Sequence, residues 1–225
     1  MIHTAFLIDK TNKVSIIKLT MLVCGLGDIM PRTGLSKEKI IEKAAELANE
    51  KGLSYLSVTT LADYLGIKKP SLYNHMKTIE DMHRDLMIYG WRIVSEEVVK
   101  GIDSSDEKKN LTAYGRKLYK FAIDNPGVFE AMLWYNKYSD DVLISVTEGL
   151  YTFFFAQTDG LGIEREIANH LLRTYRAFLE GFIMLQIHNS FGNPISVDES
   201  FEISIKVLIS GMEQFRKKGE RNDGI

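Results

Sequence analysis

The spacing of apolar residues is the feature that most limits how this chain can fold. From Ser36 onward they recur three and four positions apart, as on one face of a helix, and no stretch shows the sustained alternation of a strand. Glycine and proline divide this pattern into separate helices, as at Gly52, Pro126 and Pro194. The chain is therefore expected to be all-α.

Capping residues indicate where these helices begin. Ser36 and Ser57 each precede a periodic run, and Thr78 lies three residues before Asp81, which is the spacing of a capping box. Pro70 suits a first helical turn, where its missing N–H has no partner to lose. We expect helices over residues 37–51, 58–65, 70 to 75 or 76, 78 to about 102, 104 or 105 to 124, 128–134, 139–158 and 163–190, with a last helix that reaches residue 215.

Net charge and cysteine content exclude several classes of protein. The formal net charge is −2 at pH 7, so a nucleic-acid site has to be a local patch rather than a property of the whole surface. The single cysteine, Cys24, excludes a disulfide framework and a cysteine zinc site within one chain. This use of cysteine is typical of a reducing cytoplasm, where we expect the protein to act.

Residues 1–29 lie before the first capped helix and do not share its pattern. The run 14–29 is largely apolar and follows two lysines, as in a signal peptide. However, Lys18 interrupts the run, no small-residue cleavage site follows it, and it is too short to span a bilayer. We expect either an extension that is dispensable for folding or a segment upstream of a true start at Met30, and no membrane partner.

Two short predicted helices, 58–65 and 70 to about 76, are joined by a tight turn at Gly66. Such a pair binds DNA when the first helix braces the second and the second presents polar side chains to the major groove. Here Leu61 faces inward from the first helix and Leu72 holds the second. The lysine, serine, tyrosine and asparagine side chains of the second helix suit phosphates and base edges. The pattern therefore predicts a helix-turn-helix.

The segment 56–77, LSVTTLADYLGIKKPSLYNHMK, resembles the signature of the TetR family of transcriptional regulators. The matching positions are Leu61, Ala62, Leu65, Gly66, Leu72, Tyr73 and His75, together with Ala44, Ala45, Leu47, Glu50 and Gly52 of the preceding helix. Farther along, NPGVF at 125–129 and RAFLEGFIMLQ at 176–186 resemble one subfamily, which has an aromatic and glycine run in its long C-terminal helix. The resemblance covers roughly residues 36–215.

This resemblance implies an N-terminal three-helix helix-turn-helix domain, followed by a C-terminal helical ligand-binding and dimerisation domain. We place the first domain at residues 30–80, the second at 81–217 and a tail at 218–225. The implied partners are a second copy of the chain, a double-stranded DNA operator of pseudo-palindromic sequence and a small-molecule effector. We expect a repressor that the effector releases from DNA; the alternative is an all-helical carrier or enzyme without DNA binding.

The expected DNA contacts surround the second helix of the motif. By resemblance Tyr73 reaches a phosphate, whereas His75 either contacts DNA or satisfies the turn before Thr78. The chain departs from the family pattern at Lys68, where many members have a capping serine or threonine, and at Ile79, where lysine is common; Lys68 then faces phosphate instead. The candidate residues are Thr59, Thr60, Lys68, Lys69, Pro70, Ser71, Tyr73, Asn74, His75 and Lys77.

Aromatic side chains of the second domain either line a ligand cavity or form its core. The candidate ligand contacts are Trp91, Trp134, Phe154, Tyr175, Phe178 and Phe182, so a hydrophobic or aromatic ligand is expected. Arg173, Arg176 and Glu180 either select a polar end of that ligand or are solvated. His170 and His188 lie about 27 Å apart on one predicted helix and cannot share a metal. No catalytic motif stands out, and we expect no enzyme activity, metal or cofactor.

Overall fold

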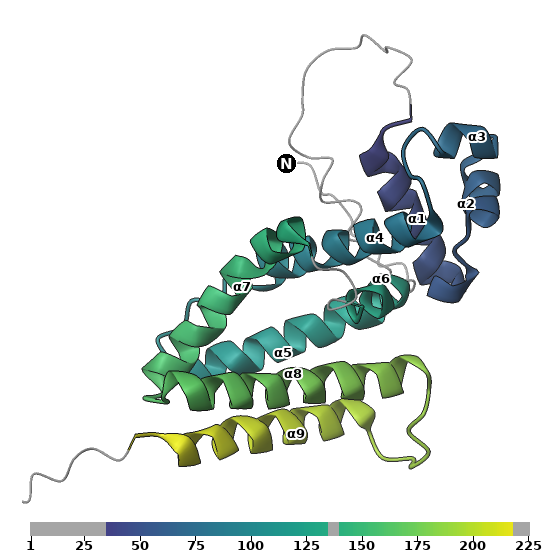
Figure 1. Ribbon diagram of the computed structural model, residues 1–225. Helices are drawn as coiled ribbons and strands as arrows, with labels where there is room; N and C mark the ends of the chain where they lie inside the picture. Colours follow the sequence, from purple (N-terminus) through teal and green to yellow (C-terminus); the bar gives the residue numbers. More distant parts are fainter. Residues whose placement is uncertain (1–34, 135–139, 218–225) are drawn as a thin grey trace, which may run out of the picture. The chain divides into compact units, whose positions relative to one another are not determined.

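The computed structural model describes residues 35–134 and 140–217, which fold as helices joined by short connections (Figure 1). The N-terminal helices are α1 (Lys37–Lys51), α2 (Val58–Leu65), α3 (Lys69–Leu72) and α4 (Ile79–Ile93). The later helices are α5 (Glu107–Asp124), α6 (Pro126–Met132), α7 (Asp141–Gly160), α8 (Arg165–Ile187) and α9 (Val197–Met212). Within the described residues the only extended pairing is an isolated bridge between Ile163 and Arg216, so the all-α expectation is confirmed.

The predicted caps of the first helices are confirmed. Ser36 accepts a hydrogen bond from the Lys39 backbone N–H and begins α1. Ser57 and Thr60 form a reciprocal capping box at the start of α2, and Thr78 forms another with Asp81 at the start of α4. These signals depend on residues three positions apart, which is why the sequence reveals them.

Several helix boundaries differ from the sequence prediction. The α-helical part of α4 ends at Ile93 and continues as a π-helical turn, η4 (Val94–Val98), instead of running to residue 102. Asp106 caps α5, in place of Ser104 or Ser105, because its carboxylate accepts from two backbone N–H groups of the first turn. α8 ends at Ile187, three residues before the predicted end at residue 190, and Asn189 follows with a left-handed φ of 51°.

Three predictions fall where the structure gives no description. The start at Ser139, the extension 1–29 and the tail 218–225 all lie outside the described residues. Asp140 caps α7 and accepts from the backbone N–H groups of Val142 and Leu143. Within the described ranges, no helix is both long and apolar enough to cross a membrane.

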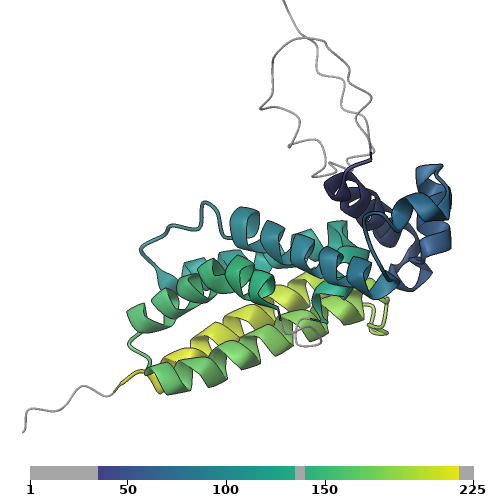
Figure 2. The same cartoon turned by 45° about the horizontal axis from the view of Figure 1, so that its top comes forward.

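α5, α7, α8 and α9 pack against one another and bury part of the apolar core between them. The hydroxyl of Tyr175 on α8 is buried and donates to the Leu111 carbonyl on α5 at 2.5 Å. α8 and α9 run side by side in opposite directions in both views (Figures 1 and 2). Phe178 and Phe182 of α8 pack against Phe201 of α9 with ring centroids 5.9 and 5.3 Å away. Phe178, Phe182 and Phe201 therefore form an aromatic seam between the two helices.

α6 is a short helix that is packed against both α1 and α4. Its Gly127 lies so close to α1 that a Cβ built there would stand 2.2 Å from the Ala48 carbonyl oxygen. On the α4 side, a Cβ at Gly90 would stand 2.6 Å from the Met132 side chain. Because neither glycine carries a side chain, the α6 backbone approaches that of α1 at Gly127, and side chains of α6 pack against the α4 backbone at Gly90.

We expect Gly127→Ala to destabilise the protein by about 2 kcal/mol or more, because the new methyl group meets backbone rather than a movable side chain. The control is Gly149→Ala in α7, where a Cβ would meet nothing within 4 Å. Removing a helical glycine there should stabilise the protein by up to about 1 kcal/mol. Urea unfolding of both variants checks this; equal effects would show that α6 is not held tightly against α1.

Candidate nucleic-acid interface and cavity

α2 and α3 form a tight helix-turn-helix. Gly66 ends α2 with a left-handed φ of 66°, a conformation that glycine adopts without strain. Lys68 is the N-cap residue of α3 and makes no side-chain capping bond, as expected from its lack of an acceptor. Leu72 and Met76 are 0% and 4% exposed and fix α3 to the other helices. α3 ends at Leu72 and is shorter than predicted, but hydrogen-bonded turns continue from Leu72 to Met76.

Most of the candidate DNA contacts share the outward side of this motif. Tyr73 is 55% exposed, although its ring is large enough to fill a core position. No ion pair joins the lysines of this region to another described residue, so their charges are available. The exposed members of the candidate set are Thr59, Lys68, Lys69, Pro70, Ser71, Tyr73, Asn74 and Lys77.

Thr60 and His75 differ from the other candidates. Thr60 is only partly exposed, and its hydroxyl donates to the Tyr55 carbonyl and accepts from the Ser57 N–H within the helix start. Its hydrogen bonds are thus used within the motif, which favours a capping role for Thr60 over contact with DNA. His75 is also partly buried, beside the turn that precedes Thr78.

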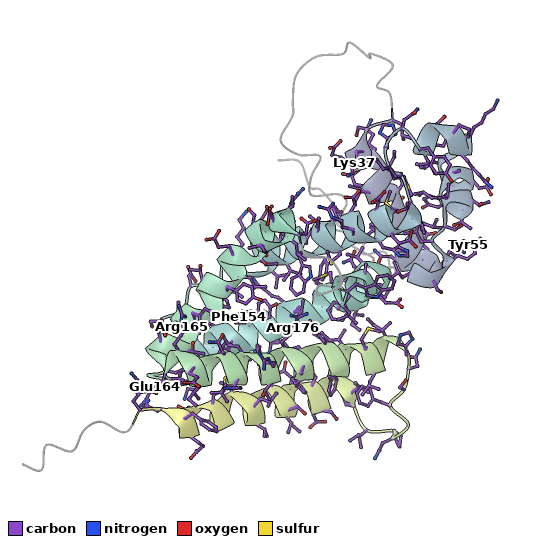
Figure 3. All side chains as sticks on the ribbon, in the orientation of Figure 1. Lys37, Tyr55, Phe154, Glu164, Arg165 and Arg176 are labelled. Carbon is purple, nitrogen blue, oxygen red and sulfur yellow. The ribbon has the colours of Figure 1, made fainter. Side chains whose placement is uncertain are left out.

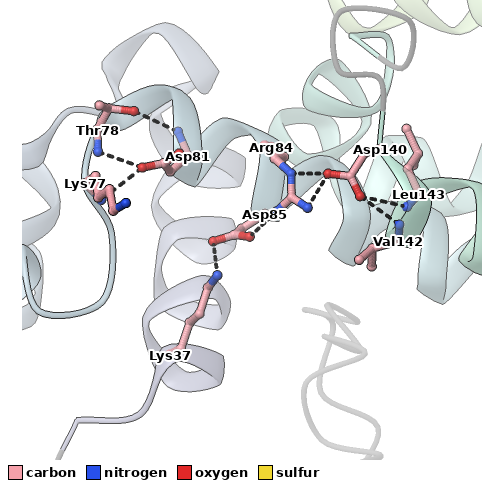
Figure 4. A network of polar contacts seen from close by, with 9 residues as sticks. All are labelled: Lys37, Lys77, Thr78, Asp81, Arg84, Asp85, Asp140, Val142 and Leu143. Atoms are coloured by element: carbon pink, nitrogen blue, oxygen red, sulfur yellow. Dashed lines mark hydrogen bonds and ion pairs between the residues drawn. The ribbon is translucent and has the colours of Figure 1, made fainter.

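A chain of ion pairs links α1, α4 and α7 (Figure 4). Asp85 on α4 is 7% exposed and binds Lys37 at the start of α1 at 2.8 Å. Its other oxygen faces Arg84, which in turn pairs with Asp140. Burial alone would raise the pKa of Asp140, but Arg84 and two backbone N–H groups of α7 hold that pKa below its ordinary value. The network therefore joins the N-terminal helices to the start of α7.

A cavity of about 230 Å³ lies among α4, α5, α7 and α8. This volume is slightly below the usual range for small-molecule pockets, about 300–1,000 Å³. Three of the six predicted ligand contacts, Trp91, Phe154 and Tyr175, line it. Phe154 and Arg176 are labelled in Figure 3, on α7 and α8 respectively, and both belong to the cavity wall.

The other three predicted ligand contacts lie elsewhere. Phe178 and Phe182 belong to the aromatic seam between α8 and α9, where Phe178 is stacked on Phe201 and Phe182 meets it edge to face. Trp134 makes an edge-to-face contact with His83, with ring centroids 5.2 Å apart. None of these three lines the cavity. On α8, the helical turn directs Phe178 and Phe182 toward α9 while Tyr175 lines the cavity. This cavity therefore lies around Trp91, Phe154 and Tyr175 rather than beside Trp134 and Phe178.

Polar side chains of α8 line one side of the cavity at positions 169, 173, 176 and 180. Three of them, Arg173, Arg176 and Glu180, are the charged residues that the sequence offered as a polar end of the site. Asn169 of α8 and Tyr114 and Leu118 of α5 were not in the predicted set. Arg176 binds Glu180 at 2.6 Å, and its guanidinium lies 5.6 Å from the centre of the Trp91 ring.

Hydrogen bonds connect this cavity to α1 through α6. The indole N–H of Trp91 donates to the Met132 carbonyl at the last residue of α6, at 3.2 Å. At the other end of α6, the Val128 N–H donates to the side-chain oxygen of Asn49 on α1, at 3.0 Å. Asn49 thereby caps a helix that begins 77 residues farther along the chain, since Asn125 makes no side-chain capping bond there.

Comparison with known proteins identifies both parts of the chain. The family model "Bacterial regulatory proteins, tetR family" matches residues 40–86, and "Tetracyclin repressor-like, C-terminal domain" matches residues 111–208. The chain is 27% identical over 188 residues to the HTH-type transcriptional regulator YobS of Bacillus subtilis (strain 168), covering 81% of this chain and 95% of YobS. It is also 46% identical to the class D tetracycline repressor protein of Escherichia coli over 43 residues, 19% of this chain and 20% of that protein.

Solved structures share the fold. A TetR variant from Acinetobacter baumannii AYE in complex with minocycline has a TM-score of 0.64 at 20% identity, covering 82% of this chain and 99% of that one. ActR of Streptomyces coelicolor in complex with (S)-DNPA has a TM-score of 0.61 at 17% identity, covering 79% and 96%. With both family models matched in their expected order over a TetR-like fold, the chain belongs to the TetR family of transcriptional regulators.

Proposed function

We propose that this chain is a homodimeric repressor that binds a pseudo-palindromic operator through α3 and leaves it when a small molecule enters the cavity. The observation that carries the proposal is the exposed polar side of α3 and of the residues next to it, with Lys68, Lys69, Tyr73 and Lys77 exposed while Leu72 is buried. A helix presented in this way fits the major groove. The proposed DNA-binding and ligand-binding domains cover residues 30–80 and 81–217, and the protein acts in the cytoplasm, where its DNA lies.

The outward side of α8 and α9 supports the dimer. Ile203 and Val207, one turn apart on α9, are 55% and 66% exposed, and Leu185 on α8 is 47% exposed. Gly181 and Gly211 lie on the same helices, and a Cβ at either would meet nothing within 4 Å. Apolar and small residues on two adjacent helices allow close packing on the same two helices of a second copy.

Release requires that a ligand in the cavity changes the position of α3. The effector must bind the DNA-bound and released conformations unequally. Trp91 lines the cavity and holds the end of α6, while Asn49 of α1 holds its beginning. We propose that α6 transmits the shift to α1, and that the ion pairs of Asp85 keep α4 and α1 moving together. The minocycline and (S)-DNPA complexes of similar folds support a small-molecule effector in this protein.

Selection from random DNA should yield two half-sites related by two-fold symmetry, about one helical turn apart or a multiple of it. Lys69→Ala should relax base preference in the half-site. Tyr73→Phe should weaken binding to every sequence alike, by roughly fivefold, because it removes one phosphate hydrogen bond. The control is Lys120→Ala, an exposed lysine on α5 that should have no effect. A single asymmetric half-site would contradict the symmetric dimer.

The dimer surface is tested by Ile203→Lys. In a symmetric interface the substitution places one lysine from each copy, and the two like charges repel each other. Association should therefore weaken by roughly tenfold or more. Ile144→Lys is the matched control, since Ile144 is 61% exposed on α7, away from α8 and α9. Sedimentation over a range of concentrations measures both. If the two variants associate equally, this side of α8 and α9 is not the interface.

The role of α6 is tested by Trp91→Phe, which keeps an aromatic ring in the cavity but removes the N–H that holds Met132. The ligand is a compound found by screening for release of operator DNA. In the unaltered protein we expect it to weaken operator binding by roughly 5–150-fold. In Trp91→Phe the compound should still bind, as seen by thermal shift, but the loss of operator affinity should be much smaller. Trp134→Phe, outside the cavity, should respond normally; equal responses of both variants would exclude this route.

A further inference from the structure

The cavity has one polar wall and one apolar wall. Asn169, Arg173, Arg176 and Glu180 come from successive turns of α8. The lining contributed by α4, α5 and α7 is mostly aromatic and aliphatic, with Trp91, Leu118, Leu150, Phe154 and Phe155, although Thr147 and Tyr151 also line it. An occupant that satisfies both walls needs a hydrophobic body and a polar end that faces α8.

The Tyr114 hydroxyl belongs to the polar end. Tyr114 is 3% exposed and lines the cavity, yet no hydrogen bond joins its hydroxyl to another residue in the described part of the chain. Burial raises the pKa of Tyr114 well above its ordinary value, Glu180 raises it further and Arg176 lowers it. The group is therefore a neutral O–H donor beside those two charges. Because Tyr114 lines the cavity, its hydroxyl can donate a hydrogen bond to an acceptor on a ligand there.

The charges of this wall favour an anion. Arg176 and Glu180 bind each other at 2.6 Å, so their charges largely cancel. Arg173, one turn earlier on the same wall, makes no ion pair with any described residue. It lies at the exposed side of the cavity, where a charged ligand end keeps part of its hydration. One arginine in excess and one free hydroxyl donor both suit a carboxylate.

From this arrangement we infer that the effector is a small amphipathic monoanion, an aromatic or aliphatic carboxylate whose charged end accepts hydrogen bonds from Tyr114 and lies beside Arg173 and Arg176. Its apolar body packs against Trp91 and Phe154. The inference rests on the proposed function, since it names the ligand class of the same cavity. The volume of about 230 Å³ restricts the effector to a small molecule of this kind.

Three probes of one shape and different charge test the inference: phenylacetate, phenylacetamide and 2-phenylethylamine. Calorimetry with the full chain should show phenylacetate binding most tightly at millimolar concentration or below. Tyr114→Phe should weaken phenylacetate binding by roughly tenfold. The matched control is Tyr119→Phe, whose hydroxyl binds Asp198 outside the cavity and should leave phenylacetate binding unchanged.

The variant Glu180→Gln distinguishes an anionic ligand from a cationic one. Removing this carboxylate should tighten phenylacetate binding several-fold, whereas Arg173→Gln should weaken it by a similar factor and leave phenylacetamide binding unaltered. If the amine binds most tightly and Glu180→Gln weakens it, the cavity selects cations and the inference is overturned. Binding of none of the three probes, or equal binding of all three, also overturns it. Operator binding by the same samples is measured in parallel, so that failure of the ligand class is distinguished from failure of the DNA-binding function.

Discussion

The contact between α1 and α6 is the constraint on which the rest of the arrangement depends. Gly127 places the α6 backbone directly against the Ala48 carbonyl, and the Asn49 side chain supplies the capping acceptor that α6 lacks in its own sequence. Because any added side chain at Gly127 would meet backbone, α6 has little freedom to move without α1. A helix of the C-terminal part is thus tied mechanically to the helix that braces the helix-turn-helix.

Because of this contact, a change of structure at the cavity can reach α3 through α6 and α1. Trp91 belongs both to the cavity wall and to the hydrogen bond that ends α6, so a ligand that displaces its ring acts on α6 directly. A second connection runs from Lys37 through Asp85 and Arg84 to Asp140 at the start of α7. Asp85 is buried between two cations, and such a carboxylate is costly to leave without a partner. The N-terminal helices are therefore connected to the C-terminal part in two ways, through α6 and through the ion pairs at the start of α7.

The sequence predicted those features that depend on near neighbours. The capping boxes at Ser57 and Thr78 and the left-handed Gly66 follow from residues a few positions apart, and all are present. Contacts between distant segments were not predictable in the same way. The capping bond from the Val128 N–H to Asn49 spans 79 residues, and only tertiary packing decides that Phe154 faces the cavity while Phe178 faces α9. For the same reason, the aromatic content indicated a cavity but not which of its residues line it.

Amide hydrogen exchange of α6 tests most directly whether this helix couples the two parts of the protein. If ligand binding affects DNA through α6, then DNA binding must affect α6 by thermodynamic reciprocity. The account predicts that the Val128 amide exchanges more slowly when the protein is bound to its selected operator, although α6 lies outside the helix-turn-helix. It also predicts that Asn49→Ala abolishes this slowing. The same exchange rate at Val128 in free and operator-bound protein would contradict the account.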